Sequence, residues 1–320
     1  MSFALKLLLS TVIAFLLNLL AMKFLPLSDK IIGHDRGKIW VEGSEVNINK
    51  PTGVGFYFVI IFAVVSGIFV YNQIGLIYIL ILTLAAMVTG VLDDRSKEAW
   101  GEYIKGALDA IIAFFGALCF VYFFGREVTI GLTGYTFEIP VAVYVILAFI
   151  LYIVAINATN ATDGIDGLSA TLTIITVASA MAVSKINGTL TENAILMGAV
   201  LIAVLLAYLI FNFNPSKVLM GDAGSRAIGF FIAFYLMYLK IPFAYLIICL
   251  IFLLDGGLSV LKITIGRLTR RKIIILKNTI TPIHDHLRKR KGLSIKQDWA
   301  VLVCADLLIN LIYIACCYFI

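Results

Sequence analysis

Residues 143–183 read VYVILAFILYIVAINATNATDGIDGLSATLTIITVASAMAV, two apolar runs joined by a short polar segment. This segment carries two carboxylates, Asp163 and Asp166, spaced by glycines that permit tight turns. An apolar helix of roughly 20 residues crosses the bilayer hydrocarbon, and both runs approach that length. A carboxylate beside hydrocarbon is costly unless it meets water, a cation or a partner. The stretch therefore predicts two membrane helices joined by a functional loop.

The composition of the whole chain supports the same interpretation. Hydrophobic residues make up 62% of the 320 residues and charged residues only 14%, far outside the usual range of soluble domains. We therefore expect an all-α integral membrane protein with a single transmembrane domain covering residues 1–320. Ten apolar runs predict about ten transmembrane helices, near residues 3–25, 54–72, 74–92, 106–124, 140–157, 169–183, 195–212, 226–240, 243–262 and 299–319.

The positive charges predict which face of the membrane each loop occupies. Ten spans place both termini on one face and five loops on the other, at residues 26–53, 93–105, 158–168, 213–225 and 263–298. The chain has 25 Lys and Arg residues, and all lie in or beside these loops except Lys6, Arg126, Lys185 and Lys240. By the positive-inside rule the five loops are cytoplasmic and the termini are extracytoplasmic. The polar motifs can therefore converge on one cytoplasmic surface and form an active site.

On the opposite face, residues 125–139 predict a small β-hairpin. The segment alternates Val128, Ile130 and Leu132 with polar residues and contains a glycine-rich turn. We assign no chemistry to this hairpin.

The third span ends in two adjacent carboxylates, Asp93 and Asp94, which are followed by Arg95 and Lys97. Both acids could be surface charges satisfied by the neighbouring cations. Paired acids beside a basic side chain also suit a site for a divalent cation and a phosphate, because Mg²⁺ takes carboxylate and phosphate oxygens together.

A further carboxylate, Asp222, lies between Gly221 and Gly224 shortly before the eighth span. Alone it could be an N-cap beside the helix macrodipole. Because the other acidic loops are expected on the same face, we favour a functional role for Asp222 over a simple N-cap.

The last cytoplasmic loop contains His284-Asp285-His286 and then a run of cations from Arg288 to Lys291. Zinc normally takes three or four nitrogen or sulfur ligands, and only His34 remains, with no cysteine in any cytoplasmic loop. Phosphate binding is therefore favoured over zinc. The basic loop fits anionic headgroups or a polyanionic substrate. We expect no nucleic-acid partner, because the loop connects two membrane spans and lies at the bilayer surface.

Four ordered motifs carry a resemblance to a known family. They are LDDRSK at 92–97, NATNATDGIDGL at 157–168, FNFNPSKVLMGDAGS at 211–225 and TPIHDHLRKRKG at 281–292. Together they resemble the polyprenyl-phosphate N-acetylhexosamine-1-phosphate transferase superfamily, whose members have about ten membrane spans and a cytoplasmic Mg²⁺ site. The match covers most of the chain.

The resemblance implies an enzyme of the bacterial cytoplasmic (inner) membrane whose active site faces the cytoplasm. Undecaprenyl phosphate would attack the sugar-bound phosphorus of a UDP-sugar donor, giving a lipid pyrophosphate sugar and UMP. The sequences of residues 162–168, 50–55 and 281–284 most resemble those of one branch of the superfamily. Members of that branch transfer phospho-N-acetylmuramoyl-pentapeptide and form lipid I for peptidoglycan synthesis. That branch usually has three consecutive histidines where this chain has His284-Asp285-His286. The likeness also implies a homodimer.

The same resemblance implies roles for particular residues. Asp222 is the leading Mg²⁺ ligand, and Asn212, at the end of the adjacent span, is expected close enough to bond a phosphate. Asp93 serves either as a base or, as we favour, in positioning the metal or the nucleophile. The catalytic set is Asp93, Asp94, Asp222 and His284. The substrate-binding set is Lys50, Lys97, Asn157, Asn160, Asp163, Asp166, Asn212 and His286.

Three other functions are compatible with a chain of this kind. The same chemistry could use another UDP-N-acetylhexosamine, such as a donor of N-acetylglucosamine-1-phosphate for teichoic acid or O-antigen. A secondary transporter could also have about ten spans, but its acids tend to lie at mid-membrane in broken helices, whereas these lie at span ends. A non-catalytic scaffold would not need acids gathered on one face.

Overall fold

Helices form at every predicted apolar run of the chain. The computed structural model describes residues 1–24, 33–35, 49–96 and 100–320. The first eight helices are α1 (Phe3–Phe24), α2 (Gly55–Phe69), α3 (Ile74–Arg95), α4 (Glu102–Phe124), α5 (Val141–Thr162), α6 (Leu168–Ile186), α7 (Glu192–Asn212) and α8 (Gly221–Tyr238). A broken segment follows, made of η2 (Pro242–Ala244), α9 (Tyr245–Ile248), α10 (Leu250–Phe252), η3 (Leu253–Gly257) and α11 (Leu258–Leu268). The chain ends with α12 (Ile283–Lys291) and α13 (Ile295–Phe319).

The prediction of an all-α membrane protein is confirmed. Within the described residues, seven helices are long and apolar enough to cross a membrane, and eight if the bent pair Pro242–Ile248 and Leu250–Leu268 forms one span. The count of ten stays a prediction, because α2 has only 15 residues and the start of α8 carries Asp222 and Arg226.

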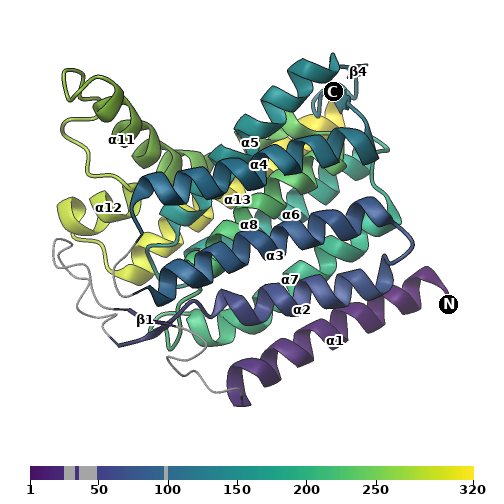
Figure 1. The fold of residues 1–320 in the computed structure, drawn as a ribbon, viewed down its shortest axis with the longest axis horizontal. Coiled ribbons are helices and arrows are strands. Elements are labelled where there is room, and N and C mark those ends of the chain that lie inside the picture. Colours follow the sequence, from purple (N-terminus) through teal and green to yellow (C-terminus); the bar gives the residue numbers. More distant parts are fainter. Residues whose placement is uncertain (25–32, 36–48, 97–99) are drawn as a thin grey trace.

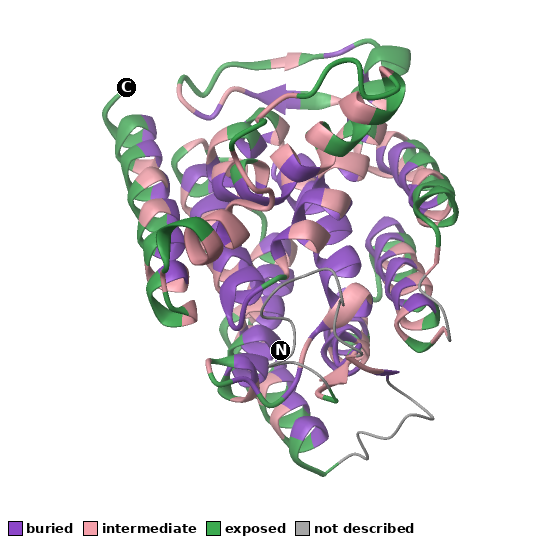
Figure 2. Ribbon diagram, turned by 90° about the vertical axis from the view of Figure 1, so that its left-hand side faces the viewer, coloured by how far each residue is buried: buried purple, intermediate pink, exposed green. Residues whose placement is uncertain are grey.

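The helix α8 forms the centre of the bundle. Every side chain from Ala223 to Met237 is buried, which is typical of a helix enclosed by others on all sides. It packs most extensively against α3 and α5, and less extensively against α2, α4 and α6. Figure 1 shows α8 in the middle of the molecule, and Figure 2 shows buried residues facing inward across the bundle.

The two chain ends lie at the same end of the molecule, together with a short hairpin (Figure 1). The hairpin pairs β3 (Glu127–Thr129) with β4 (Thr136–Glu138) in antiparallel register, so the hairpin predicted at 125–139 is confirmed. At the opposite end lie α12 and the short pair of β1 (Gly33–His34) and β2 (Pro51–Thr52). This arrangement fits an even number of crossings, and the membrane face of each end stays a prediction.

The structure adds two details to the predicted spans. The run at 243–262 is not one continuous helix, because it bends by 69° at a break beside Cys249 and then passes through a π-helical turn, η3. Several helices also extend beyond the predicted runs, and α5 reaches Thr162 while α8 already begins at Gly221. Hydropathy marks the hydrocarbon depth, whereas helical hydrogen bonding continues into the polar boundary layer.

Close packing of α3 on α8 generates a test of the fold. A methyl group added at Gly90 would lie 2.3 Å from the backbone carbonyl of Asp222, so the two helices would have to separate. We expect Gly90→Ala to destabilise the protein by about 1–3 kcal/mol, as overpacking does, and to lower the thermal unfolding temperature in detergent.

The matched control is Gly106→Ala in α4, where an added methyl group meets nothing within 4 Å. It should be neutral or slightly stabilising, because alanine favours a helix. Equal unfolding temperatures for the two variants would contradict the close α3–α8 contact.

Candidate active site

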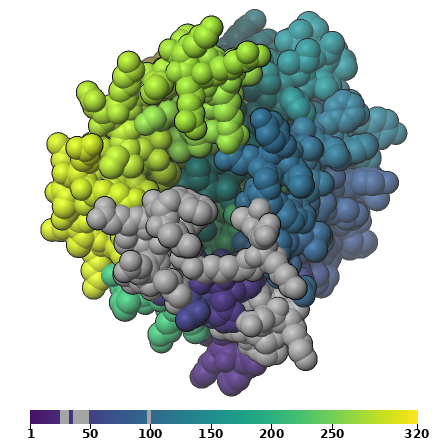
Figure 3. Space-filling model, turned by 60° about the vertical axis from the view of Figure 1, so that its left-hand side comes forward, coloured from purple at the N-terminus to yellow at the C-terminus, as the bar shows by residue number. Residues whose placement is uncertain are grey.

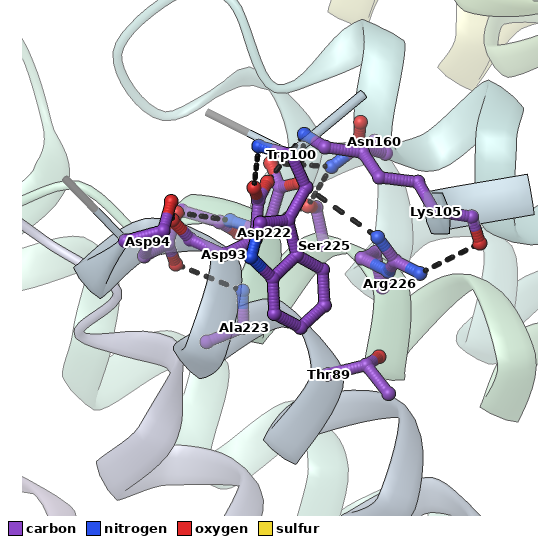
Figure 4. Close-up of polar contacts among 12 residues, drawn as sticks. Thr89, Asp93, Asp94, Trp100, Lys105, Asn160, Asp222, Ala223, Ser225 and Arg226 are labelled. Atoms are coloured by element: carbon purple, nitrogen blue, oxygen red, sulfur yellow. Dashed lines mark hydrogen bonds and ion pairs between the residues drawn. The ribbon is translucent and has the colours of Figure 1, made fainter. Parts of the chain in front are cut away.

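Four helix ends meet in a cluster of charged and amide side chains at the end of the bundle that holds α12. Asp93 belongs to the last turn of α3, Lys105 to the first turn of α4, Asn160 to the last turn of α5 and Asp222 to the first turn of α8. The Lys105 ammonium contacts the carboxylates of both Asp93 and Asp222, and lies 3.0 Å from Asp222 Oδ2. Figure 4 shows these side chains pointing toward one another.

Asp94 connects α3 to the start of α8. Its Oδ1 and Oδ2 accept hydrogen bonds from the backbone N–H groups of Asp222 (3.2 Å) and Ala223 (3.1 Å). The carboxylate therefore caps the N-terminus of a helix to which it does not belong, where the helix dipole favours negative charge. Asp94 fixes the position of Asp222 rather than facing the centre of the cluster.

Two further donors fix the remaining carboxylates. Asp93 Oδ1 accepts the backbone N–H of Trp100 at 2.7 Å. The Asn160 amide donates to Asp222 Oδ1 and to Ser225 Oγ, both at 2.9 Å. Burial opposes ionisation of Asp222, but the charge of Lys105 and the hydrogen bonds from Asn160 and Lys105 outweigh it and hold the Asp222 pKa below its usual value.

Directly beneath this cluster lies a buried ion pair between Arg226 of α8 and Asp109 of α4. Arg226 Nη2 lies 2.5 Å from Asp109 Oδ1, and Arg226 Nη1 lies 3.9 Å from Asp222 Oδ2. Sequence reasoning missed Lys105, Asp109 and Arg226. The available signal was a charge at or inside an apolar run, which in a membrane protein is a functional candidate by default.

His284 lies in a second polar group, paired with an acid that sequence reasoning also missed. Its backbone N–H donates to Asp255 Oδ1, and its ring Nδ1 lies within hydrogen-bond distance of Asp255 Oδ2, both at 2.8 Å. Burial lowers the pKa of His284, but the charge and hydrogen bond of Asp255 outweigh it and raise the pKa above its usual value. The π-helical turn η3 carries Asp255, and turns of this kind are frequent at functional sites.

The ring of His284 also contacts the acidic loop that follows α5. A methyl group added at Gly164 would lie 2.1 Å from His284 Nε2, so glycine there allows the ring to approach the backbone. Among the described residues the hydrogen bonds of His284 go to Asp255, and its catalytic role stays a prediction.

The side chains of Asp166 and Asn212 connect the loop after α5 to the loop after α7 by hydrogen bonds. Asp166 is buried and accepts hydrogen bonds from the Asn214 amide and from the backbone and hydroxyl of Ser216, at 2.7–3.0 Å. Asn212 accepts the backbone N–H of Gly167 at 2.9 Å and donates to the carbonyl of Val218 at 2.8 Å. The side chain of Asn212 thus connects backbone groups of both loops, and its contact with a phosphate stays a prediction.

The other predicted site residues lie around these groups. Lys50 donates to Ser216 at 3.0 Å, and Asp163 directly follows the last residue of α5. Asn157 donates to Asp109 (3.4 Å) and to the carbonyl of Ile153. His286 Nδ1 accepts the backbone N–H of Ile280 at 3.3 Å. Lys97 lies outside the described residues.

A hollow opens at this end of the molecule. Figure 3 shows it between the yellow-green segment that contains α11 and α12 and the blue segment at the start of α4. Between α11 and α12 a separate cavity of about 440 Å³ is lined by Lys262, Lys277 and Arg290 among others. This separate cavity is therefore lined in part by cations.

The carboxylate cluster suits a divalent cation whose remaining ligands are waters or substrate phosphates. In the part of the chain that the structure describes, no group of three or more His, Cys, Asp or Glu side chains could hold a metal ion by itself. Mg²⁺, however, is usually bound through one or two carboxylates together with waters and substrate phosphates. Asp93 and Asp222 already share one cationic group, the Lys105 ammonium, so the donor set fits such a site.

Comparisons with known proteins agree with this geometry. The family described as "Glycosyl transferase family 4" matches residues 76–240. A phospho-N-acetylmuramoyl-pentapeptide-transferase of Treponema pallidum (strain Nichols) is 33% identical over 283 residues, covering 83% of this chain and 77% of the relative. One of Streptococcus pneumoniae (strain CGSP14) is 28% identical over 274 residues, covering 82% and 81%.

The fold and site define a membrane-embedded glycosyl transferase. With more than half of its length matched by the family and with relatives aligned over most of both chains, the protein belongs to glycosyl transferase family 4. The relatives named above are phospho-N-acetylmuramoyl-pentapeptide-transferases. The superfamily that the four motifs predict is therefore confirmed.

The pairing of His284 with Asp255 predicts a pH-dependent stability. A histidine whose pKa is raised on folding contributes stability that is fully present below its unfolded pKa of about 6.5. This stability is lost as the pH rises through the folded pKa. We therefore expect Asp255→Asn to lower the thermal unfolding temperature most at pH 6 or below and progressively less as the pH rises.

The matched control places Asp255→Asn in a His284→Gln background, where no ring remains to be protonated. There the effect of Asp255→Asn should not vary with pH in the same range. An equal loss at pH 6 and pH 9 in the histidine-containing protein would contradict the charged pair.

Proposed function

We propose that this protein transfers phospho-N-acetylmuramoyl-pentapeptide from a UDP-linked donor to undecaprenyl phosphate, forming lipid I and releasing UMP. The observation that carries the proposal is the convergence of Asp93, Lys105 and Asp222 from three helix ends in a chain aligned with such transferases over most of its length. The reaction must position the oxygens of two phosphates. This cluster has an ammonium group that can bind such oxygens and carboxylates that can bind a cation between them.

The chemistry consists of one exchange of phosphorus–oxygen bonds. An oxygen of the lipid phosphate attacks the sugar-linked phosphorus and forms a pyrophosphate bond. The bond between that phosphorus and UMP breaks, and UMP leaves with the electron pair. Because two anions must approach, catalysis of phosphoryl transfer depends mainly on positioning and on neutralising charge.

Asp222, with Asp93 beside it, would hold Mg²⁺. When bound, the ion would neutralise charge on the phosphate oxygens and orient them. Lys105 is placed to meet a phosphate oxygen, because its side chain is partly exposed while the side chains of Asp93 and Asp222 are more buried.

Asp93 serves better in positioning than as a base. A phosphate monoester has a second pKa of about 6 and is already mostly dianionic at pH 7, so removing its proton would lower the barrier little. The carboxylate of Asp93 also accepts the Trp100 N–H and contacts Lys105. These contacts fix its orientation at the edge of the metal site.

The nucleotide would bind near the loop that follows α5. Asp166 and Asn212 hold that loop against residues 213–220, while Lys50 and Asp163 lie at its edge and would contact the nucleotide directly. His284 would contact a phosphate or the sugar from beside Gly164. We place this surface on the cytoplasmic face because the positive loops gather there. The homodimer implied by the resemblance stays a prediction.

Release of UMP from the purified protein tests the reaction. With undecaprenyl phosphate and Mg²⁺, UDP-N-acetylmuramoyl-pentapeptide should release UMP, whereas UDP-N-acetylglucosamine should not, and chelation of Mg²⁺ should abolish release. Turnover with UDP-N-acetylglucosamine alone would assign the same chemistry to a different sugar. No release from either donor would overturn the proposal.

Asp222→Asn tests the metal role within the same assay. We expect UMP release to fall by about a hundredfold or more, because a group that stabilises developing charge is lost. The control is Glu138→Gln in the hairpin, a neutralised carboxylate at the opposite end of the molecule, which should keep normal turnover. Normal turnover and normal Mg²⁺ dependence in Asp222→Asn would show that Asp222 is not a ligand.

A further inference from the structure

Beneath Asp222 lies a second cation, Arg226, that none of the proposed catalytic roles uses. Its side chain is 2% exposed and lies one helical turn after Asp222 on α8, with Nη1 at 3.9 Å from Asp222 Oδ2. A guanidinium matches a carboxylate well, because two N–H groups can bind two oxygens in parallel. Arg226 is therefore placed to compete with any cation that Asp222 binds.

The carboxylate of Asp109 pairs with the other terminal nitrogen of this guanidinium, Nη2. Arg226 Nη2 lies 2.5 Å from Asp109 Oδ1, and the same nitrogen lies 3.4 Å from the carbonyl oxygen of Lys105. The Asp109 side chain is only 3% exposed, so the pair is little screened by water. The nearest approach of Arg226 to Asp222, by contrast, is beyond hydrogen-bond range.

The two cations next to Asp222 thus differ in kind. Lys105 has a side chain that is 27% exposed and a flexible stem, so it can move when a ligand arrives. Arg226 is enclosed and cannot leave. A fixed counter-ion such as Asp109 would hold it away from Asp222.

We propose that Asp109 is a positioning residue that keeps the Arg226 guanidinium paired away from Asp222, so that the Asp222 carboxylate stays open to a divalent cation. The inference rests on the proposed role of Asp222 as a metal ligand. It makes Asp109 part of the metal site without contact between Asp109 and the metal.

A purely structural role for the pair leads to a different expectation. If the ion pair only clamps α4 to α8, loss of either partner alone should harm the site similarly, because one buried charge is then left unpaired. If Asp109 restrains Arg226, loss of Asp109 alone harms metal binding, additional loss of Arg226 restores it, and loss of Arg226 alone leaves metal binding intact. A buried pair can often be replaced by uncharged residues without loss of folding, whereas one charge left alone is destabilising.

Binding of Mn²⁺ to the full chain in detergent micelles, without substrate, separates these roles. Electron paramagnetic resonance of free Mn²⁺ gives the dissociation constant directly. For Asp109→Asn we expect it to rise about tenfold or more, equivalent to roughly 1.4 kcal/mol. For Asp109→Asn combined with Arg226→Met we expect it to return to within about twofold of the unsubstituted protein, because the competing cation is gone.

Arg226→Met alone keeps the test independent of whether Asp109→Asn folds. It should bind Mn²⁺ at least as tightly as the unsubstituted protein, and thermal unfolding reports separately on any loss of stability. The matched control is Glu138→Gln, which removes the carboxylate of another Asp/Glu–Arg pair, with Arg126, in the hairpin. It should leave the dissociation constant unchanged.

The inference is overturned if the double variant binds Mn²⁺ as weakly as Asp109→Asn, or if Arg226→Met weakens binding tenfold. Absence of Mn²⁺ binding by the unsubstituted protein would overturn both this inference and the metal role of Asp222. The transferase reaction would still be tested on its own by UMP release.

Discussion

The pairing of buried charges at one end of α8 is the constraint on which the rest of the structure depends. The helix is enclosed on all sides, yet its first turns carry Asp222 and Arg226, and a buried charge without a partner is strongly destabilising. Lys105 and Asp109 supply the partners from α4, and Asp94 caps the helix from α3. The contacts that hold the bundle together are therefore also those that arrange the site.

Much of the fold and the acids at the span ends could be predicted from the sequence. Hydropathy locates helices because the hydrocarbon sets their minimum length, and Asp93, Asp94 and Asp222 stood out because they interrupt or end apolar runs. The extent of the helices could not be predicted in this way. Asn160 and Asp222 belong to the ends of α5 and α8 rather than to loops, since backbone hydrogen bonding continues beyond the apolar residues.

The partners of these acids could not be predicted, because they depend on how helices distant in sequence pack. Lys105 and Asp109 fall at or inside a run that was predicted only as a span, and their role appears only when α8 lies beside α4. Asp255 is 29 residues from His284 and meets it only because the span that holds Asp255 is broken and bent. For the same reason the backbone contacts of Asn212 could not be inferred from its position at the end of α7.

The site is thus built from two kinds of polar groups. Asp94, Asp166, Asn212 and Asp255 are bound to backbone or side-chain groups of the protein and fix its loops and helix ends. Asp93, Lys105 and Asp222 face one another at the hollow end of the bundle. Anomalous X-ray scattering from crystals grown with Mn²⁺ and the UDP-linked donor tests the account most directly. It predicts a peak bound to the carboxylate of Asp222, whereas a peak bound elsewhere, or no peak near that carboxylate, would contradict it.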